Sequence, residues 1–155
     1  MLLDGPPDDR RSLAVHDDPE ATLLSVLATL DPRRKERGPY RRIVFGVDPG
    51  DVIGLAVLAD GEALLVAESL SPQDAADRIA SWSRGLAAAE WHVHVGDGAP
   101  AKGRAVAEAL GHRVPQARLH FVPEGRTTPY RPETGSRHTD AAVSIALREP
   151  VGKER

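Results

Sequence analysis

The hydrophobic residues of this chain fall into five short runs that are typical of strands. They are bounded by residues with turn chemistry and span 42–47, 52–59, 62–68, 91–95 and 117–122. The second and third runs are separated only by Asp60-Gly61, a two-residue signal for a hairpin. The first three runs therefore predict an antiparallel meander.

Helical spacing of apolar residues appears between and after the later strands. One helix is predicted to begin at Pro72 with Ser71 as its cap, and its apolar positions are Ala75, Ala76, Ile79, Trp82 and Leu86. Further helices are predicted over 101–110, closed by Gly111, and over 137–148. Strands that alternate with helices are joined by crossovers and lie parallel. The pattern predicts an α/β fold whose mixed five-stranded sheet has strands four and five parallel to strand one.

The first 40 residues have a different pattern from the rest. A short helix is predicted over 19–30, with Asp18 as its cap and Pro19 in its first turn, followed by a charged segment over 31–40. We therefore expect an N-terminal tail with a short helix and a basic linker over 1–40, and the α/β domain over 41–150. The helix is a candidate for covering a sheet edge or for dimerisation.

Composition narrows the chemistry that is available. The 155 residues include no cysteine, so a bound metal would need carboxylate, histidine or backbone ligands. No apolar run approaches the ~20 residues of a membrane helix, and the N-terminus lacks the pattern of a secretory signal. We expect a soluble, cytoplasmic protein. The net charge of −3 hides basic stretches over 31–42 and 113–137 that could neutralise phosphates or could simply be solvated.

Four acidic residues stand where a sheet of this kind would gather them. Asp48, Asp97 and Glu124 follow strands one, four and five, and Asp140 lies in the first turns of the last helix. The carboxyl ends of parallel strands meet at one edge, where ligands bind. Oxygen-only ligands suit Mg²⁺ or Mn²⁺. Taken singly, each residue has a structural alternative: Asp48 and Asp97 as turn formers, Glu124 as a solvated loop acid, and Asp140 as a partner of the helix dipole.

Two segments resemble RuvC-type Holliday-junction resolvases, a branch of the ribonuclease-H-like superfamily. Residues 43–58, with the turn Asp48-Pro49-Gly50, are similar to the family's first two strands, and residues 139–147, with the Asp140-Ala141 pair, to its last catalytic helix. Residues 124–128 are similar to a segment of the related YqgF-type nucleases, with Gly125 inserted. The resemblance implies a ribonuclease-H-like fold, and a homodimer acting on branched nucleic acid.

The resemblance also implies roles for individual residues. Asp48, Asp97 and Asp140 would be catalytic metal ligands, with Glu124 as an auxiliary ligand that Glu133 could replace. Asp97 stands where the resolvases carry Glu, and Arg137 stands where they carry Asp or His. His138 is two residues from Asp140, so it could assist only from a position before the regular helix.

These observations favour a metal-dependent endonuclease that cleaves branched DNA or structured RNA. Candidate nucleic-acid contacts are Lys102, Arg126, Arg131 and His138. The main alternative is a non-catalytic nucleic-acid-binding or scaffold module with the same fold, and a third is one nucleotide-binding lobe of the actin/Hsp70 type. His92 and His94 share one strand face and could pair on a metal, although we expect them at the surface or packed against a helix.

Overall fold

In a computed structural model of the protein, the predicted mixed sheet is present. The structure describes residues 17–34, 38–124 and 135–150. The five strands lie in the order β3-β2-β1-β4-β5, and their bounds are β1 Tyr40–Asp48, β2 Ile53–Ala59, β3 Glu62–Ser69, β4 Ala88–Gly96 and β5 Arg118–Val122. β1, β2 and β3 pair antiparallel, whereas β4 is parallel to β1 and β5 is parallel to β4. The predicted α/β fold, with a mixed five-stranded sheet in which strands four and five run parallel to strand one, is confirmed.

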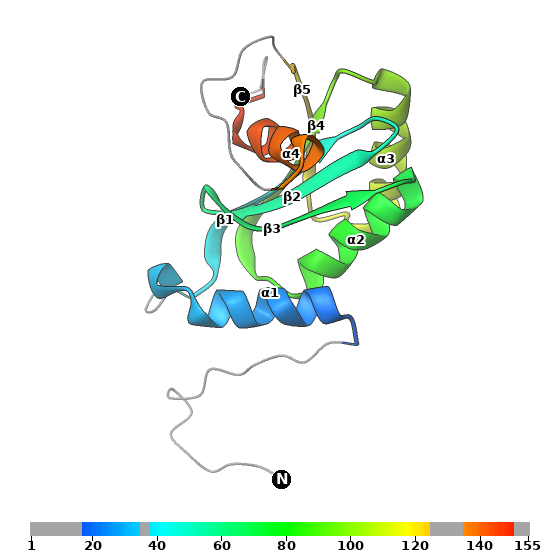
Figure 1. Ribbon diagram of the computed structural model, residues 1–155. Helices are drawn as coiled ribbons and strands as arrows, with labels where there is room; N and C mark the ends of the chain where they lie inside the picture. Colours follow the sequence, from blue (N-terminus) through cyan, green and yellow to red (C-terminus); the bar gives the residue numbers. More distant parts are fainter. Residues whose placement is uncertain (1–16, 35–37, 125–134, 151–155) are drawn as a thin grey trace, which may run out of the picture.

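Helices cover both faces of this sheet (Figure 1). Helices α2 (Pro72–Arg84) and α3 (Pro100–Arg113) lie on one face and α4 (Arg137–Leu147) on the other. Helix α1 (Pro19–Leu30) runs beside α2 and is followed by the short 3₁₀ helix η2 (Pro32–Arg34). Because β1 is central and covered on both faces, residues 43–47 are all buried. This explains why its sequence is a continuous apolar run rather than an alternating one.

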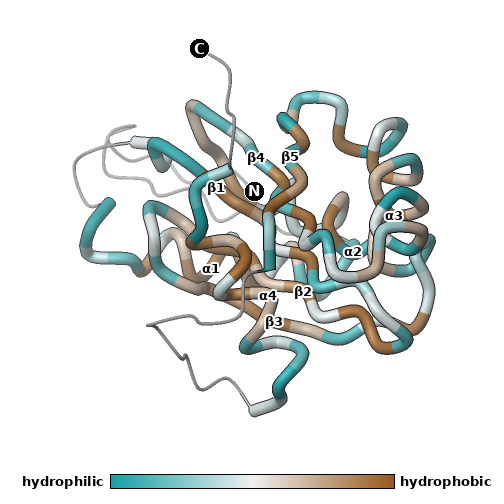
Figure 2. The backbone as a smooth tube through the Cα atoms, turned by 90° about the horizontal axis from the view of Figure 1, so that it is seen from above, coloured by the Kyte–Doolittle hydropathy of each residue, from teal (hydrophilic) through white to brown (hydrophobic). Residues whose placement is uncertain are grey.

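The larger hydrophobic core lies between the sheet and the helices α1, α2 and α3. Phe45, Leu55, Ile79, Trp82 and Val106 are among its fully buried side chains. Figure 2 shows the hydrophobic colour concentrated along the central strands, while α3 alternates between hydrophobic and hydrophilic residues. These patterns predict a helix with one hydrophobic face that packs against strands buried on both faces.

Helix α1 starts and ends where the sequence predicts, and it is part of the larger core. The Asp18 carboxylate accepts a hydrogen bond from Glu20 N at 2.8 Å, which caps the helix. Leu24 is fully buried in the core. An added Cβ on Gly85, just after α2, would collide with the carbonyl of Ala21, so the two helices approach each other closely at a glycine.

The smaller core joins α4 to the opposite face of β1 and β2. It consists of Val44, Ala56, Leu58, Ala142, Val143 and Ala146. Two strand glycines permit the close approach of this helix. A Cβ on Gly46 would overlap the carbonyl of Ala142, and one on Gly54 would overlap the carbonyl of His138. The strand glycines therefore set how near the first turns of α4 lie to the end of β1.

Two local predictions have different outcomes. The Asp60-Gly61 hairpin turn is confirmed, with φ of 49° and 88°, the left-handed values that a two-residue turn between twisted strands requires. The predicted closure of the second helix at Gly111 is wrong, because α3 continues to Arg113 and Val114 follows as its cap. The Arg113 guanidinium donates to the carbonyl of Ala109 and contacts Asp77 and Gln73 of α2, which holds this last turn in place.

The helices of the described residues include none that is both long enough and apolar enough to cross a membrane.

Candidate active site

A cleft of about 530 Å³ opens at the carboxyl end of β1. Its lining comes from the turn after β1, the segment after β5 and the start of α4: Asp48, Pro49, Gly50, Asp51, Val52, Glu124, Arg137, His138 and Ala141. Asp48 is the last residue of β1 and is half-buried. This is the sheet edge at which the sequence predicts the acidic residues to gather.

Glu124 is held at this edge by backbone hydrogen bonds from both sides. Its Oε2 accepts from the N–H of Gly98 at 2.9 Å, and its own N–H donates to Asp97 Oδ1 at 3.1 Å. A Cβ on Gly96 or Gly98 would collide with the Glu124 carboxylate, so the segment after β4 has glycines where that side chain rests. Asp97 thus positions Glu124 by bonding its backbone, a contact that the sequence does not reveal.

The environment of Asp48 disfavours its negative charge. Burial raises the pKa of this carboxyl to about 6, and the negative charge of Glu124 adds to the rise. The positive charges of His138 and Arg137 oppose it. A carboxyl with a pKa near neutrality beside a second acid is typical of functional sites.

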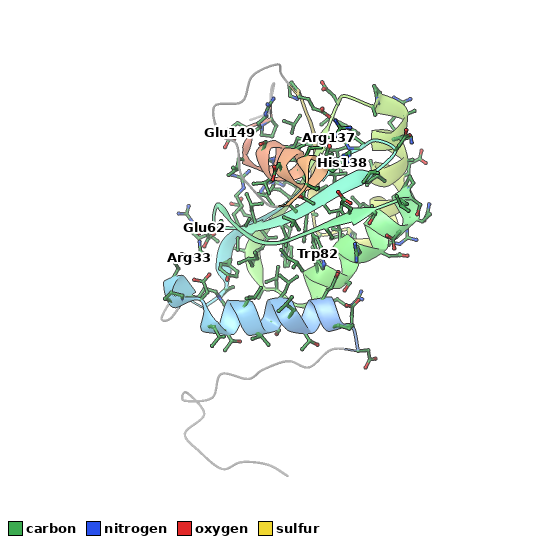
Figure 3. All side chains as sticks on the ribbon, in the orientation of Figure 1. Arg33, Glu62, Trp82, Arg137, His138 and Glu149 are labelled. Carbon is green, nitrogen blue, oxygen red and sulfur yellow. The ribbon has the colours of Figure 1, made fainter. Side chains whose placement is uncertain are left out.

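Helix α4 forms the basic wall of the cleft. Its first two residues, Arg137 and His138, both line the cleft (Figure 3). Because α4 begins at Arg137, His138 lies inside the regular helix and not in the position before it from which the sequence would allow it to assist Asp140. The close approach of His138 to Gly54 brings this first turn against β2, beside the end of β1.

The remaining predicted site residues have varied positions. Asp140 is half-buried in the first turn of α4 and is not part of the cleft lining. The N-cap of this helix, Ser136, accepts a hydrogen bond from Thr139 N.

Lys102 donates to Asp51 at 2.6 Å at an exposed position, so the rim of the cleft carries a salt bridge. Arg126, Arg131 and Glu133 lie outside the described residues. The structure therefore joins Asp48 and Glu124 in one cleft, and connects Asp97 to them through Glu124.

The donor set of this cleft fits a hard divalent cation. Mg²⁺ is usually bound through one or two carboxylates, keeps several waters and accepts substrate phosphates. Asp48 and Glu124 offer carboxylate oxygens whose mutual repulsion a cation would remove. Within residues 17–34, 38–124 and 135–150, no three His, Asp or Glu side chains are grouped so that they could hold an ion. Asp48 and Glu124 could therefore hold such an ion as a carboxylate pair, with water completing its coordination.

No family model matches the chain, and no curated protein is significantly similar to it.

Proposed function

We propose that this protein is a divalent-metal-dependent endonuclease of the RuvC-like branch, and that it hydrolyses phosphodiesters in branched DNA or structured RNA at the cleft beside Asp48. The observation that carries the proposal is the pair of carboxylates, Asp48 and Glu124, at one edge of a ribonuclease-H-like sheet. The resemblance of the Asp48-Pro49-Gly50 turn and of the Asp140-Ala141 pair to the resolvases supports it.

Each wall of the cleft has a part in this proposal. Asp48 and Glu124 would hold Mg²⁺ or Mn²⁺, with Asp97 keeping Glu124 in place through its backbone. A cation bound there supplies Lewis-acid polarisation of a phosphate oxygen and lowers the pKa of a bound water. Arg137 and His138, on the opposite wall, would contact the non-bridging oxygens of the scissile phosphate and orient it. Asp140 remains a proposed third ligand from the first turn of α4.

The experiment compares cleavage by the wild type, Asp48→Asn and Asp51→Asn. Substrates are labelled four-way junctions, flaps, hairpins and linear duplexes of DNA and RNA, with Mg²⁺ or Mn²⁺. Asp51 is the matched control because it lines the same cleft, yet it is exposed and paired with Lys102. We expect metal-dependent cleavage that falls at least ~100-fold in Asp48→Asn and little in Asp51→Asn. Equal activity of the wild type and Asp48→Asn on every substrate would refute the proposal.

One observation favours the alternative of a non-catalytic nucleic-acid-binding module. The Arg137 guanidinium lines the cleft where the resolvases carry an acidic residue or histidine, and its charge stabilises the Asp48 carboxylate without a metal. Such a module would bind branched substrates without added metal, in a salt-sensitive manner, and would not cleave them. Binding by Asp48→Asn that equals the wild type, together with absent cleavage by both, would select this alternative.

A further inference from the structure

A cluster of three histidines lies on the sheet away from the cleft. His92 and His94 come from β4 and His120 from β5, with His94 and His120 in register. The ring centroids of His92 and His120 are 5.3 Å apart, and those of His94 and His120 are 5.4 Å apart. His92 and His94 are buried and His120 is half-buried. The proposed nuclease chemistry makes no use of any of them.

The hydrogen bonds of these rings fix which nitrogens carry protons. His92 Nε2 lies 3.1 Å from a carboxylate oxygen of Glu90, and a carboxylate can only accept, so this nitrogen carries the hydrogen. Neutral His92 therefore has its lone pair on Nδ1, which lies 3.1 Å from His120 Nε2. His94 Nδ1 must donate to the carbonyl of Ile145 in the same way, and burial lowers the pKa of His94 to about 4, which keeps it neutral.

We propose that His92 Nδ1 and His120 Nε2 form a binding site for a transition-metal ion of the Zn²⁺ class, separate from the carboxylate cleft. Two imidazole nitrogens bound at ~2.0–2.1 Å to a tetrahedral ion lie about 3.3 Å apart. The observed 3.1 Å separation is close to that spacing. Binding requires that His120 carry its proton on Nδ1 instead of Nε2, and that the two rings turn so that both lone pairs point at one ion.

The surroundings of His92 match those of metal-binding histidines. Such histidines donate their second ring N–H to a carboxylate or a backbone carbonyl, which fixes the ring and raises its basicity. Glu90 does this for His92. Imidazole nitrogen favours Zn²⁺, Cu²⁺ or Ni²⁺ over Mg²⁺. The described residues contain no group of three potential ligands placed around an ion, so water or a ligand from outside would complete the coordination.

The site would connect the edge strand to its neighbour. His92 belongs to β4 and His120 to β5, the outermost strand of the sheet. An ion held by both would crosslink the two strands and stabilise the folded chain, because metal bound only by the native state adds its binding free energy to folding. Stabilisation by an ion at the histidine site does not depend on the function of the Asp48 cleft.

The experiment is a calorimetric titration of the full chain with Zn²⁺, accompanied by Cu²⁺ electron paramagnetic resonance. The variants are His120→Gln and Glu90→Gln, the matched control is His112→Gln on an exposed position of α3, and Asp48→Asn reports on ions bound in the cleft. His120 is preferred to His92 because its half-exposed side chain can be changed with less risk to folding.

We expect one Zn²⁺ per chain at this site, with an affinity that falls more than tenfold in His120→Gln and ~10–100-fold in Glu90→Gln, and that is unchanged in His112→Gln and Asp48→Asn. The Cu²⁺ spectrum of the wild type should show coupling to two imidazole nitrogens, and that of His120→Gln to fewer. Equal Zn²⁺ affinity in the wild type and His120→Gln would overturn the proposal, as would loss of the ion only in Asp48→Asn.

Discussion

Asp48 and Glu124 form a like-charged pair at the end of the sheet, although one ends β1 and the other follows β5. Burial raises the pKa of Asp48 to about 6, and the charge of Glu124 contributes to that rise. The hydrogen bond from Gly98 N to the Glu124 carboxylate holds Glu124 at this edge of the sheet. A cation bound near both carboxylates would remove their mutual repulsion.

The first prediction concerns Glu124→Gln. The amide keeps an acceptor for Gly98 N but removes the negative charge, so the pKa of Asp48 should fall below about 6 while burial keeps it above 3.8. Carbon-13 NMR titration of the aspartate carboxyls measures this directly. Asp51→Asn is the control, because Asp51 is exposed and paired with Lys102. An Asp48 pKa that does not move in Glu124→Gln would contradict the proposed coupling.

The second prediction concerns the pH dependence of stability. The pKa of Asp48 is higher in the folded chain, about 6, than the ordinary value of 3.8. Between these values the native state binds more protons than the unfolded state, so this group lowers stability as the pH rises. Asp48→Asn lacks the effect and should therefore be more stable than the wild type above pH ~6, by about 1–2 kcal/mol after allowance for solvent screening.

Urea unfolding of both proteins between pH 4 and pH 8 provides the measurement. The advantage of Asp48→Asn should shrink as the pH falls toward ~4. Addition of Mg²⁺ at pH 7.5 should also reduce the stability advantage of Asp48→Asn, because the ion binds the wild-type carboxylates and stabilises that protein. A stability difference that does not change with pH would show that the two folded states differ for another reason.

The third prediction concerns the close approach of α4 to the sheet. A Cβ on Gly46 would overlap the carbonyl of Ala142, so Gly46→Ala must push the helix outward and should destabilise the protein by about 3 kcal/mol. Gly111→Ala is the matched control, because Gly111 lies inside α3 with open space around it. That variant should be more stable by about 0.5–1 kcal/mol. Thermal unfolding of both variants separates the loss of stability caused by the collision with α4 from the general effect of replacing a glycine.

Most of the fold follows from the hydrophobic periodicity and the turn residues that are visible in the sequence. Asp18, Ser71 and the Asp60-Gly61 turn act locally, so their effect is fixed within a few residues of chain. Helix α3 continues past the predicted end at Gly111 because contacts of Arg113 with α2, which is distant in sequence, hold its last turn. Local propensity cannot register such tertiary support.

The site was predictable only in part, for the same reason. Topology alone brings Asp48, Asp97 and Glu124 to one edge, and the structure has them there. That the Asp97 carboxylate bonds the backbone of Glu124, and that His138 rather than Asp140 lines the cleft, depends on the rotation of α4 and on loop geometry. His120 joins the histidines of β4 only through the pairing of β4 with β5, which alternation along residues 118–122 does not specify by itself.

The fourth prediction tests how firmly α1 is joined to the domain. The indole N–H of Trp82 donates to Glu20 Oε1 at 2.7 Å, and Arg78 contacts the other oxygen of the same carboxylate at 3.2 Å. The Trp82 side chain is fully buried. Glu20→Ala leaves the buried indole N–H without this acceptor and should lower the free energy of unfolding by about 1–3 kcal/mol. Glu20→Gln keeps a neutral acceptor and should lose less.

Tryptophan fluorescence during urea unfolding measures both variants, because Trp82 reports on its own contact with α1. Glu108→Ala, at an exposed position of α3, is the control for the loss of a surface glutamate and should change stability by less than ~0.5 kcal/mol. If Glu20→Ala were as stable as Glu108→Ala, the bond to Trp82 would contribute nothing measurable. Helix α1 would then be attached to the domain by the burial of Leu24 and its apolar neighbours alone.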